Sequence, residues 1–277
     1  MKFTKMHGIG NCYIYVNCFE ETVENPQELA IKVSDVHFGI GADGLVMICP
    51  SDKADFKMRI FNADGSEAKM CGNASRCVGK YVYEKGLTNK KEVTLETLSG
   101  IKILKLEEKN GEIVSVTVDM GKISLNPRDI PVLSDKDKFI DEPVEVGGKT
   151  VNITAVSVGN PHAVVFVENV DELDLEEIGP IFENHKLFPD RVNTEFIHVI
   201  DENTLKMRVW ERGSGETWAC GTGACASVAA AVENGYCKKD TEITVHLRGG
   251  DLKIVYQSDG HIIKRGPAAF ICDGVLF

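Results

Sequence analysis

Apolar and polar residues alternate in short runs along most of the chain, a pattern that favours β-strands over helices. The predicted strands are Asn11–Asn17, Lys57–Phe61, Val93–Thr97, Ala163–Val167, Asn193–Val199, Thr204–Trp210 and Glu242–Leu247. Two segments instead favour helices, Gly72–Lys85 and Gly221–Asn234, and each is followed by a glycine suited to a helix C-cap. Ala224–Val232 is apolar on every side, so we expect this helix to be buried and wrapped by its sheet.

The chain contains an internal repeat. Residues 58–86, MRIFNADGSEAKMCGNASRCVGKYVYEKG, align without a gap with residues 207–235, MRVWERGSGETWACGTGACASVAAAVENG, at an offset of 149. The same offset places Gly10-Asn11 on Gly159-Asn160 and Leu98 on Leu247. A period this long predicts two domain-sized halves rather than a solenoid. The segment 122–149 has no repeat partner and holds three prolines, so we place the inter-domain connection near or before it.

Composition restricts the class of protein. The chain has 277 residues, of which 43% are hydrophobic and 26% charged, values typical of a globular protein. A net charge of −11 argues against a nucleic acid or an anionic membrane as the main partner. The first 16 residues lack the uninterrupted apolar core of a signal peptide, no segment approaches the length of a membrane span, and nine cysteines fit a reducing compartment. We therefore expect a cytoplasmic protein, without a metal site because no CxxC, HxxxH or HExxH spacing occurs.

Both halves carry a cysteine at the start of the predicted helix, Cys71 and Cys220. The first-turn amides of a helix can bind an anion such as a carboxylate, and the helix dipole is expected to lower the pKa of a thiol placed there. Pseudo-symmetry would place the two helix starts face to face, with one sulfur on each side of a substrate carbon. This arrangement suits stereoinversion, in which a base removes the α-proton from one face and an acid returns one to the other.

The remaining cysteines lie in apolar or turn contexts without a repeated partner, so we interpret them as structural. They are Cys12, Cys18, Cys49, Cys77, Cys225, Cys237 and Cys272.

At these residues the sequence resembles the diaminopimelate epimerase family, and the resemblance covers nearly the whole chain. The matching segments are residues 6–11 (MHGIGN), 39–44 (GIGADG), 61–66 (FNADGS), 71–73 (CGN), 159–162 (GNPH), 191–195 (RVNTE), 211–213 (ERG) and 216–223 (ETWACGTG). Each segment alone is a weak signal, but eight in the family's order are a strong one.

The resemblance implies an α+β fold of two pseudo-symmetric domains, each a mainly antiparallel β-sheet or barrel wrapped around a central helix. We expect residues 1–118 with 263–277 to form one domain, and residues 119–262 the other. The resemblance further implies interconversion of LL- and meso-diaminopimelate without pyridoxal phosphate or a metal, in lysine and peptidoglycan precursor synthesis. A symmetric homodimer is the default expectation for such an enzyme.

By the same resemblance, Cys71 and Cys220 match the family's catalytic cysteines, and four helix-start residues match its carboxylate-binding amides. Those four are Gly72, Asn73, Gly221 and Thr222. The other expected substrate contacts are Asn11, Asn62, Asn160, Asn193, Glu211 and Arg212. A guanidinium such as that of Arg212 fits a second carboxylate because its geometry allows two parallel hydrogen bonds.

Three positions depart from the family's pattern: Cys12, Val36 and Ala74 replace its usual Asp, Arg and Gly. They leave substrate identity and rate open. The alternative functions are a two-cysteine racemase of another amino acid and a non-catalytic module that binds an amino acid. A third alternative function is that of a thiol redox protein, in which Cys71 and Cys220 switch between thiols and a disulfide.

Overall fold

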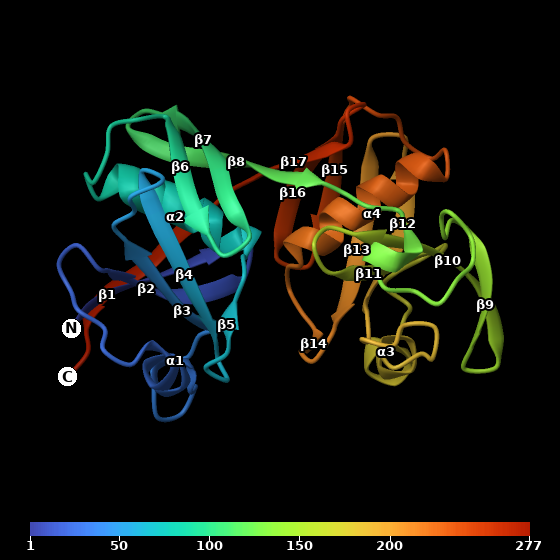
Figure 1. The fold of residues 1–277 in the computed structure, drawn as a ribbon, viewed down its shortest axis with the longest axis horizontal. Helices are drawn as coiled ribbons and strands as arrows, with labels where there is room; N and C mark the ends of the chain where they lie inside the picture. The colour runs from blue at the N-terminus through green and yellow to red at the C-terminus, as the bar shows by residue number, and fades with distance from the viewer. The chain divides into compact units, whose positions relative to one another are not determined.

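The computed structural model describes residues 1–277, and the chain divides into two compact units. The first unit comprises Met1–Asp119 with Arg265–Phe277, and the second comprises Met120–Lys264. Figure 1 shows this path: the chain leaves the first unit after its first 119 residues and returns to it in the last segment, drawn in red. Strands β8 (Glu112–Lys122) and β17 (His261–Gly266) carry the chain across the two boundaries.

The first unit is built from strands around one buried helix. Its other strands are β1 (Lys2–Gly8), β2 (Asn11–Asn17), β3 (Gly44–Cys49), β4 (Phe56–Asn62), β5 (Glu67–Ala68), β6 (Glu92–Thr97), β7 (Gly100–Lys109) and β18 (Ala269–Val275). Its helices are α1 (Pro26–Ser34) and α2 (Gly72–Glu84). Neighbouring strands pair antiparallel except for β2 with β3 and β4 with β6.

The second unit repeats this plan. It contains the 3-10 helix η1 (Pro127–Asp129), strands β9 (Glu142–Val146), β10 (Lys149–Ser157), β11 (Pro161–Phe166), β12 (Asn193–Asp201), β13 (Thr204–Glu211), β14 (Gly215–Glu216), β15 (Glu242–Leu247) and β16 (Gly250–Tyr256), and helices α3 (Leu175–Glu183) and α4 (Gly221–Glu233). Its two parallel pairs are β11 with β12 and β13 with β15, the equivalents of the two in the first unit. The duplication predicted at an offset of 149 is therefore present in the strand pairing as well.

Helices α2 and α4 are the centres of their units, as predicted. Every residue from Gly72 to Val82 is buried in α2, and Ala224–Ala231 are buried in α4. Strands of the same unit surround each helix, which Figure 1 shows for α2 and α4 separately. Both helices end one residue before the predicted boundary, and Gly86 and Gly235 follow with left-handed φ angles of 75° and 80°. The predicted fold class, a β-rich α+β fold with a central helix in each half, is confirmed.

The prediction of only one helix in each half was wrong, because α1 and α3 add a second. These two helices also correspond at the offset of 149. Asn25 and Asp174 cap them by accepting hydrogen bonds from the amides of Glu28 and Glu177. Pro180 inside α3 and the brevity of both helices conceal them in the apolar pattern. Both helices are held by tertiary packing.

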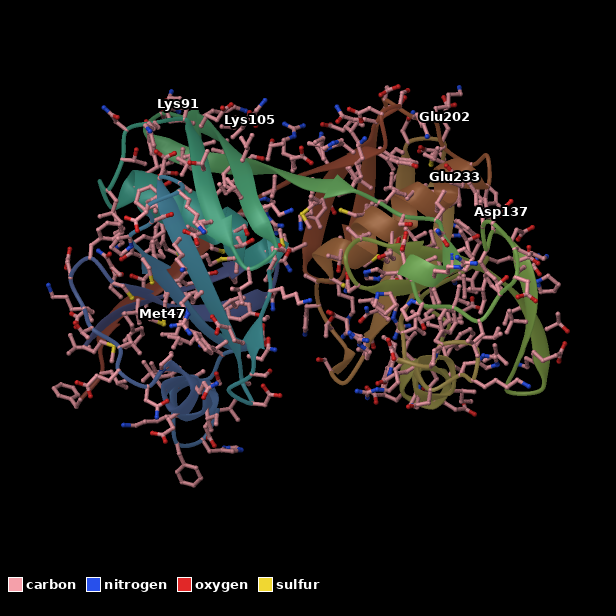
Figure 2. The ribbon with its side chains drawn as sticks, viewed as in Figure 1. Met47, Lys91, Lys105, Asp137, Glu202 and Glu233 are labelled. Carbon is pink, nitrogen blue, oxygen red and sulfur yellow. The ribbon has the colours of Figure 1, made fainter.

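Helix α1 packs on one side of the sheet of the first unit. Its buried residues Ala30 and Val33 belong to a cluster with Ile14, Leu45 and Met47. Met47, labelled in Figure 2, is 5% exposed. In the second unit a corresponding cluster includes Leu175 and Phe182 of α3. The four α-helices include none with the length and hydropathy that crossing a bilayer requires.

Candidate active site

The first half-site is formed at the start of α2. Cys71 is the N-cap residue of this helix, with extended backbone angles (φ −135°, ψ 117°). Its thiol donates to Oδ1 of Asn11 at 3.5 Å, and Nδ2 of Asn73 donates to the same oxygen at 3.3 Å. Cys71, Gly72, Asn73 and Asn11 are therefore brought together, as their predicted roles require.

Two charged residues fix the polar groups of this half-site. Arg76, fully buried in α2, donates from Nη1 to Oδ1 of Asn73 at 3.0 Å. At the other end Oδ2 of Asp43 accepts from Nδ2 of Asn11 and from the amide of Cys12, both at 2.7 Å. Asp43 lies in the GIGADG segment, to which the sequence assigned no individual role.

The second half-site lies at the start of α4. Cys220 is the N-cap residue, and its sulfur accepts from the amide of Gly223 at 3.3 Å and lies 3.6 Å from Oγ1 of Thr222. Nδ2 of Asn160 donates to the same threonine oxygen at 3.4 Å. Cys220, Gly221, Thr222 and Asn160 are therefore grouped as Cys71, Gly72, Asn73 and Asn11 are.

The expectation of a lowered thiol pKa does not hold for Cys220. Burial raises the pKa of Cys220 well above that of a free thiol, and the carboxylates of Glu211 and Glu195 raise it further. The hydrogen bonds from Thr222 and from the Gly223 amide act in the opposite direction but are the smaller effects. The helix start thus favours the thiolate, yet the loss of hydration outweighs it.

A buried polar pair lies behind Asn160. Nδ1 of His162 lies 2.7 Å from Oε1 of Glu195, and both side chains are fully buried. Nε2 of His162 lies 3.0 Å from Oδ1 of Asn160. His162 and Glu195 lie on the adjacent parallel strands β11 and β12, where the register places His162 opposite Asn193, two residues before Glu195. Side chains two residues apart on a strand share a face, so the pair forms by strand register.

Glu211 is in contact with the second cysteine. The carboxyl of Glu211 accepts a hydrogen bond from the hydroxyl of Thr217 and lies within hydrogen-bonding reach of Cys220. Burial is the largest cause that raises the pKa of Glu211, and the nearby Glu195 carboxylate adds to it. A carboxyl with a raised pKa beside a thiol can exchange a proton with it.

Three further predicted substrate contacts, Asn193, Glu211 and Arg212, lie at the start of β12 and around the end of β13. Oδ1 of Asn193 accepts from the amide of Arg212 at 3.0 Å, and Nδ2 of Asn193 donates to the carbonyl of Pro161 at 2.8 Å. Buried Glu183 accepts from the amide of Gly213 at 2.9 Å and so holds the same turn. The side chain of Arg212 is exposed and donates to the carbonyl of Asp190 at 2.8 Å. Asn193, Glu211 and Arg212 therefore lie in one region of the second unit.

Asn62 is placed differently, at the end of β4 in the first unit, where the chain enters a turn. Its Nδ2 donates to Oγ of Ser66 at 3.0 Å, and its backbone amide donates to the carbonyl of the same residue. The three positions that depart from the family's pattern lie in different surroundings. Burial raises the pKa of Cys12, Val36 is exposed in a loop, and Ala74 is fully buried in α2.

Sequence reasoning assigned no role to Asp43, His162, Glu195 or Glu183. The first three lie inside the matching segments GIGADG, GNPH and RVNTE, so the signal was present without an assignment. Glu183 lies in the helix that was not predicted. No group of three or more His, Cys, Asp or Glu side chains is arranged to hold a metal ion.

The chain matches known proteins along its whole length. A family model described as diaminopimelate epimerase matches residues 3–126 and 154–271. A diaminopimelate epimerase of Acetivibrio thermocellus is 61% identical over 275 residues, which cover 99% of this chain and 98% of the relative. One from Methanococcus maripaludis is 57% identical over 277 residues, which cover 100% and 99% of the two chains.

Solved structures share the fold at much lower identity. A probable proline racemase from Agrobacterium radiobacter has a TM-score of 0.74 and 14% identity, and the match covers 100% of this chain and 92% of that one. A phenazine biosynthesis protein of the PhzF family from Bacillus anthracis has a TM-score of 0.73 and 19% identity, with 100% and 99% covered. These likenesses show the fold, whereas the full-length relatives and the family model show the family: the chain belongs to the diaminopimelate epimerases.

Proposed function

We propose that this diaminopimelate epimerase interconverts LL- and meso-diaminopimelate with Cys71 and Cys220 as the two bases, each acting on an opposite face of one α-carbon. The main support for the proposal is the equivalence of the two cysteines. Each is the N-cap residue of the buried central helix in its own half. A hydrolytic reaction needs one nucleophile, whereas inversion needs two groups of matched chemistry.

The proton transfers balance without a further reactant. One cysteine, as thiolate, removes the α-proton and becomes a thiol, while the other, as thiol, gives its proton to the opposite face of the carbanion and becomes a thiolate. In the reverse direction the roles exchange. When Cys220 is the base its proton must leave first, and Glu211 is the group in contact with it that can accept that proton.

The carboxylate next to the reacting carbon is assigned to the helix-start amides at Gly72-Asn73 and Gly221-Thr222. The first amides of a helix have no partner inside it and favour negative charge, which grows on this carboxylate as the proton leaves. The distal carboxylate is assigned to Arg212, with Asn62, Asn160 and Asn193 as further contacts. Asn11 and Glu211 complete the proposed set of substrate contacts.

We also propose that the enzyme works as a cytoplasmic homodimer. Support comes from the composition and from the general preference of small enzymes for two-fold assemblies. Sedimentation equilibrium of the purified protein tests the assembly, and a single species of 30.4 kDa would contradict the dimer.

The test of the reaction is α-proton exchange. The reduced protein is incubated with LL-diaminopimelate in deuterated water without added cofactor, and the α-proton signal is followed by NMR beside a panel of other L-amino acids. We expect exchange with diaminopimelate alone, accompanied by the meso isomer. Exchange confined to another amino acid would reassign the substrate and retain the two-cysteine mechanism. No exchange from protein whose thiols titrate as free would reject the mechanism.

A further inference from the structure

The two half-sites contain equivalent hydrogen bonds that point in opposite directions. At the offset of 149, Asn11 corresponds to Asn160, and Asn73 corresponds to Thr222. In the first unit Asn73 donates to Asn11, whereas in the second Asn160 donates to Thr222. The hydrogen bond that connects the helix start with the hairpin turn therefore runs in opposite directions in the two halves.

Charged end groups fix the direction in the first half. Arg76 can only donate, so Oδ1 of Asn73 faces it and Nδ2 of Asn73 faces Asn11. An ionised Asp43 can only accept, so Nδ2 of Asn11 faces it and Oδ1 faces Cys71. Rotating either amide by 180° would place donor against donor or acceptor against acceptor. Asn11 consequently offers an acceptor to the thiol of Cys71.

A buried pair lies next to Asn160 in the second half. His162 and Glu195 have no exposed surface, and Oε2 of Glu195 has no hydrogen-bond partner. Nδ2 of Asn160 donates to Oγ1 of Thr222, so Oδ1 of Asn160 faces Nε2 of His162. An amide oxygen can only accept, so this hydrogen bond requires a hydrogen on Nε2.

The end groups are not part of the repeat. Arg76 corresponds to Cys225, and Asp43 to Val192. For the residues of the second half, His162 corresponds to Tyr13 in the first half, and Glu195 corresponds to Val46. The duplicated asparagines are thus retained in both halves, while the residues that orient them occur in one half each.

We propose that Asp43 with Arg76 in one half, and His162 with Glu195 in the other, are positioning residues that make the two catalytic cysteines chemically unequal. Cys71 donates to Asn11, whereas the sulfur of Cys220 accepts from the Gly223 amide and lies 3.6 Å from Oγ1 of Thr222, which accepts from Asn160. A two-base inversion needs one thiolate and one thiol at the start of each turnover. Unequal surroundings allow one cysteine to be the thiolate while the other is the thiol. The functional part of this inference rests on the proposed two-cysteine mechanism.

The first test compares Asp43→Ala with Asp43→Asn. Both variants remove the charge, but the asparagine variant retains an oxygen that accepts from Asn11, whereas the alanine variant lets Asn11 turn its amide toward Cys71. At one fixed pH, peptide-resolved mass spectrometry measures alkylation of each cysteine by iodoacetamide. We expect Cys71 to react about two- to tenfold faster in Asp43→Ala than in Asp43→Asn, the range that one hydrogen bond gives. Equal rates would overturn the role of Asp43.

The second test uses the unaltered protein. Nitrogen-15 NMR of labelled histidine rings locates the hydrogens of His162, whose signal is assigned by its loss in His162→Gln or by its slow exchange with solvent. We expect a hydrogen on Nε2. A hydrogen on Nδ1 alone would reverse Asn160 and overturn the second half of the inference.

The epimerase assay of the same samples separates this inference from the proposed function. If diaminopimelate is inverted normally, but Cys71 is alkylated at equal rates in the two Asp43 variants and Nε2 of His162 carries no hydrogen, only the positioning roles are rejected. The expected alkylation and NMR results in a protein without inversion reject only the two-cysteine mechanism.

Discussion

The sulfur of Cys220 accepts a hydrogen bond from the amide of Gly223, three residues into the helix that Cys220 begins, at 3.3 Å. Cys71, at the equivalent position of the first half, has no such cap and donates instead to Asn11. The two helix starts therefore share a backbone plan but differ in how each sulfur is hydrogen-bonded.

Each cysteine should be needed for inversion, but neither for all proton exchange. Replacing either one by serine removes one of the two bases, so we expect epimerisation to fall by roughly 10²- to 10⁴-fold. The remaining thiolate can still remove and return a proton on its own face, so each variant should retain exchange with one isomer only. The measurement is α-deuterium incorporation from LL- and from meso-diaminopimelate. Loss of exchange with both isomers in both variants would contradict independent bases.

Glu211→Gln should make Cys220 more reactive toward alkylation while lowering turnover. The Glu211 carboxylate is one cause of the raised pKa of Cys220, so a neutral amide lowers that pKa. More thiolate is then present at any pH below it, and alkylation reaches its midpoint at lower pH. Cys237 is an internal control, since burial with Asp201 and Glu202 raises its pKa to about 11 independently of Glu211. An unshifted Cys220 curve would argue against coupling of these two residues.

Arg212→Ala should weaken the productive binding of diaminopimelate. Loss of a charge-assisted contact to the distal carboxylate costs about 1.5–3 kcal/mol, so kcat/KM should fall roughly 10- to 100-fold. Steady-state kinetics measure this change, and exposed Arg128→Ala is the matched control. Equal effects of the two substitutions would remove Arg212 from the proposed site.

Gly223→Ala should destabilise the second unit, although alanine usually favours helices. A Cβ at this position would lie 2.6 Å from Oε1 of Glu195 and 3.1 Å from the sulfur of Cys220. Overpacking of this kind costs about 1–3 kcal/mol. Urea unfolding of the variant gives the change in the free energy of unfolding.

The equivalent residue of the first half provides a natural control for that substitution. Ala74 already stands there, fully buried, and the position of Glu195 is occupied by Val46 in that half. Ala74→Gly should destabilise by about 1 kcal/mol through helix propensity alone. A Gly223→Ala protein as stable as the unaltered one would show that Glu195 can move away.

The sequence by itself determined the duplication, the two central helices, their starts at Cys71 and Cys220, and the family. These features are local: a glycine past a helix end, an apolar segment and a run of motif residues are visible within a few positions. The spacing of 149 residues extended them to both halves, and the relatives confirm the family.

Only the tertiary structure decided what surrounds each cysteine. Asp43 reaches Asn11 across 32 residues, and Glu195 reaches His162 across 33, through strand pairing that no local pattern specifies. The thiol of Cys220 shows the consequence, because its position at a helix start predicts a lowered pKa and its burial beside two carboxylates raises it. Hydration and charge at a side chain depend on residues distant in the chain, so they are fixed only when the chain is folded.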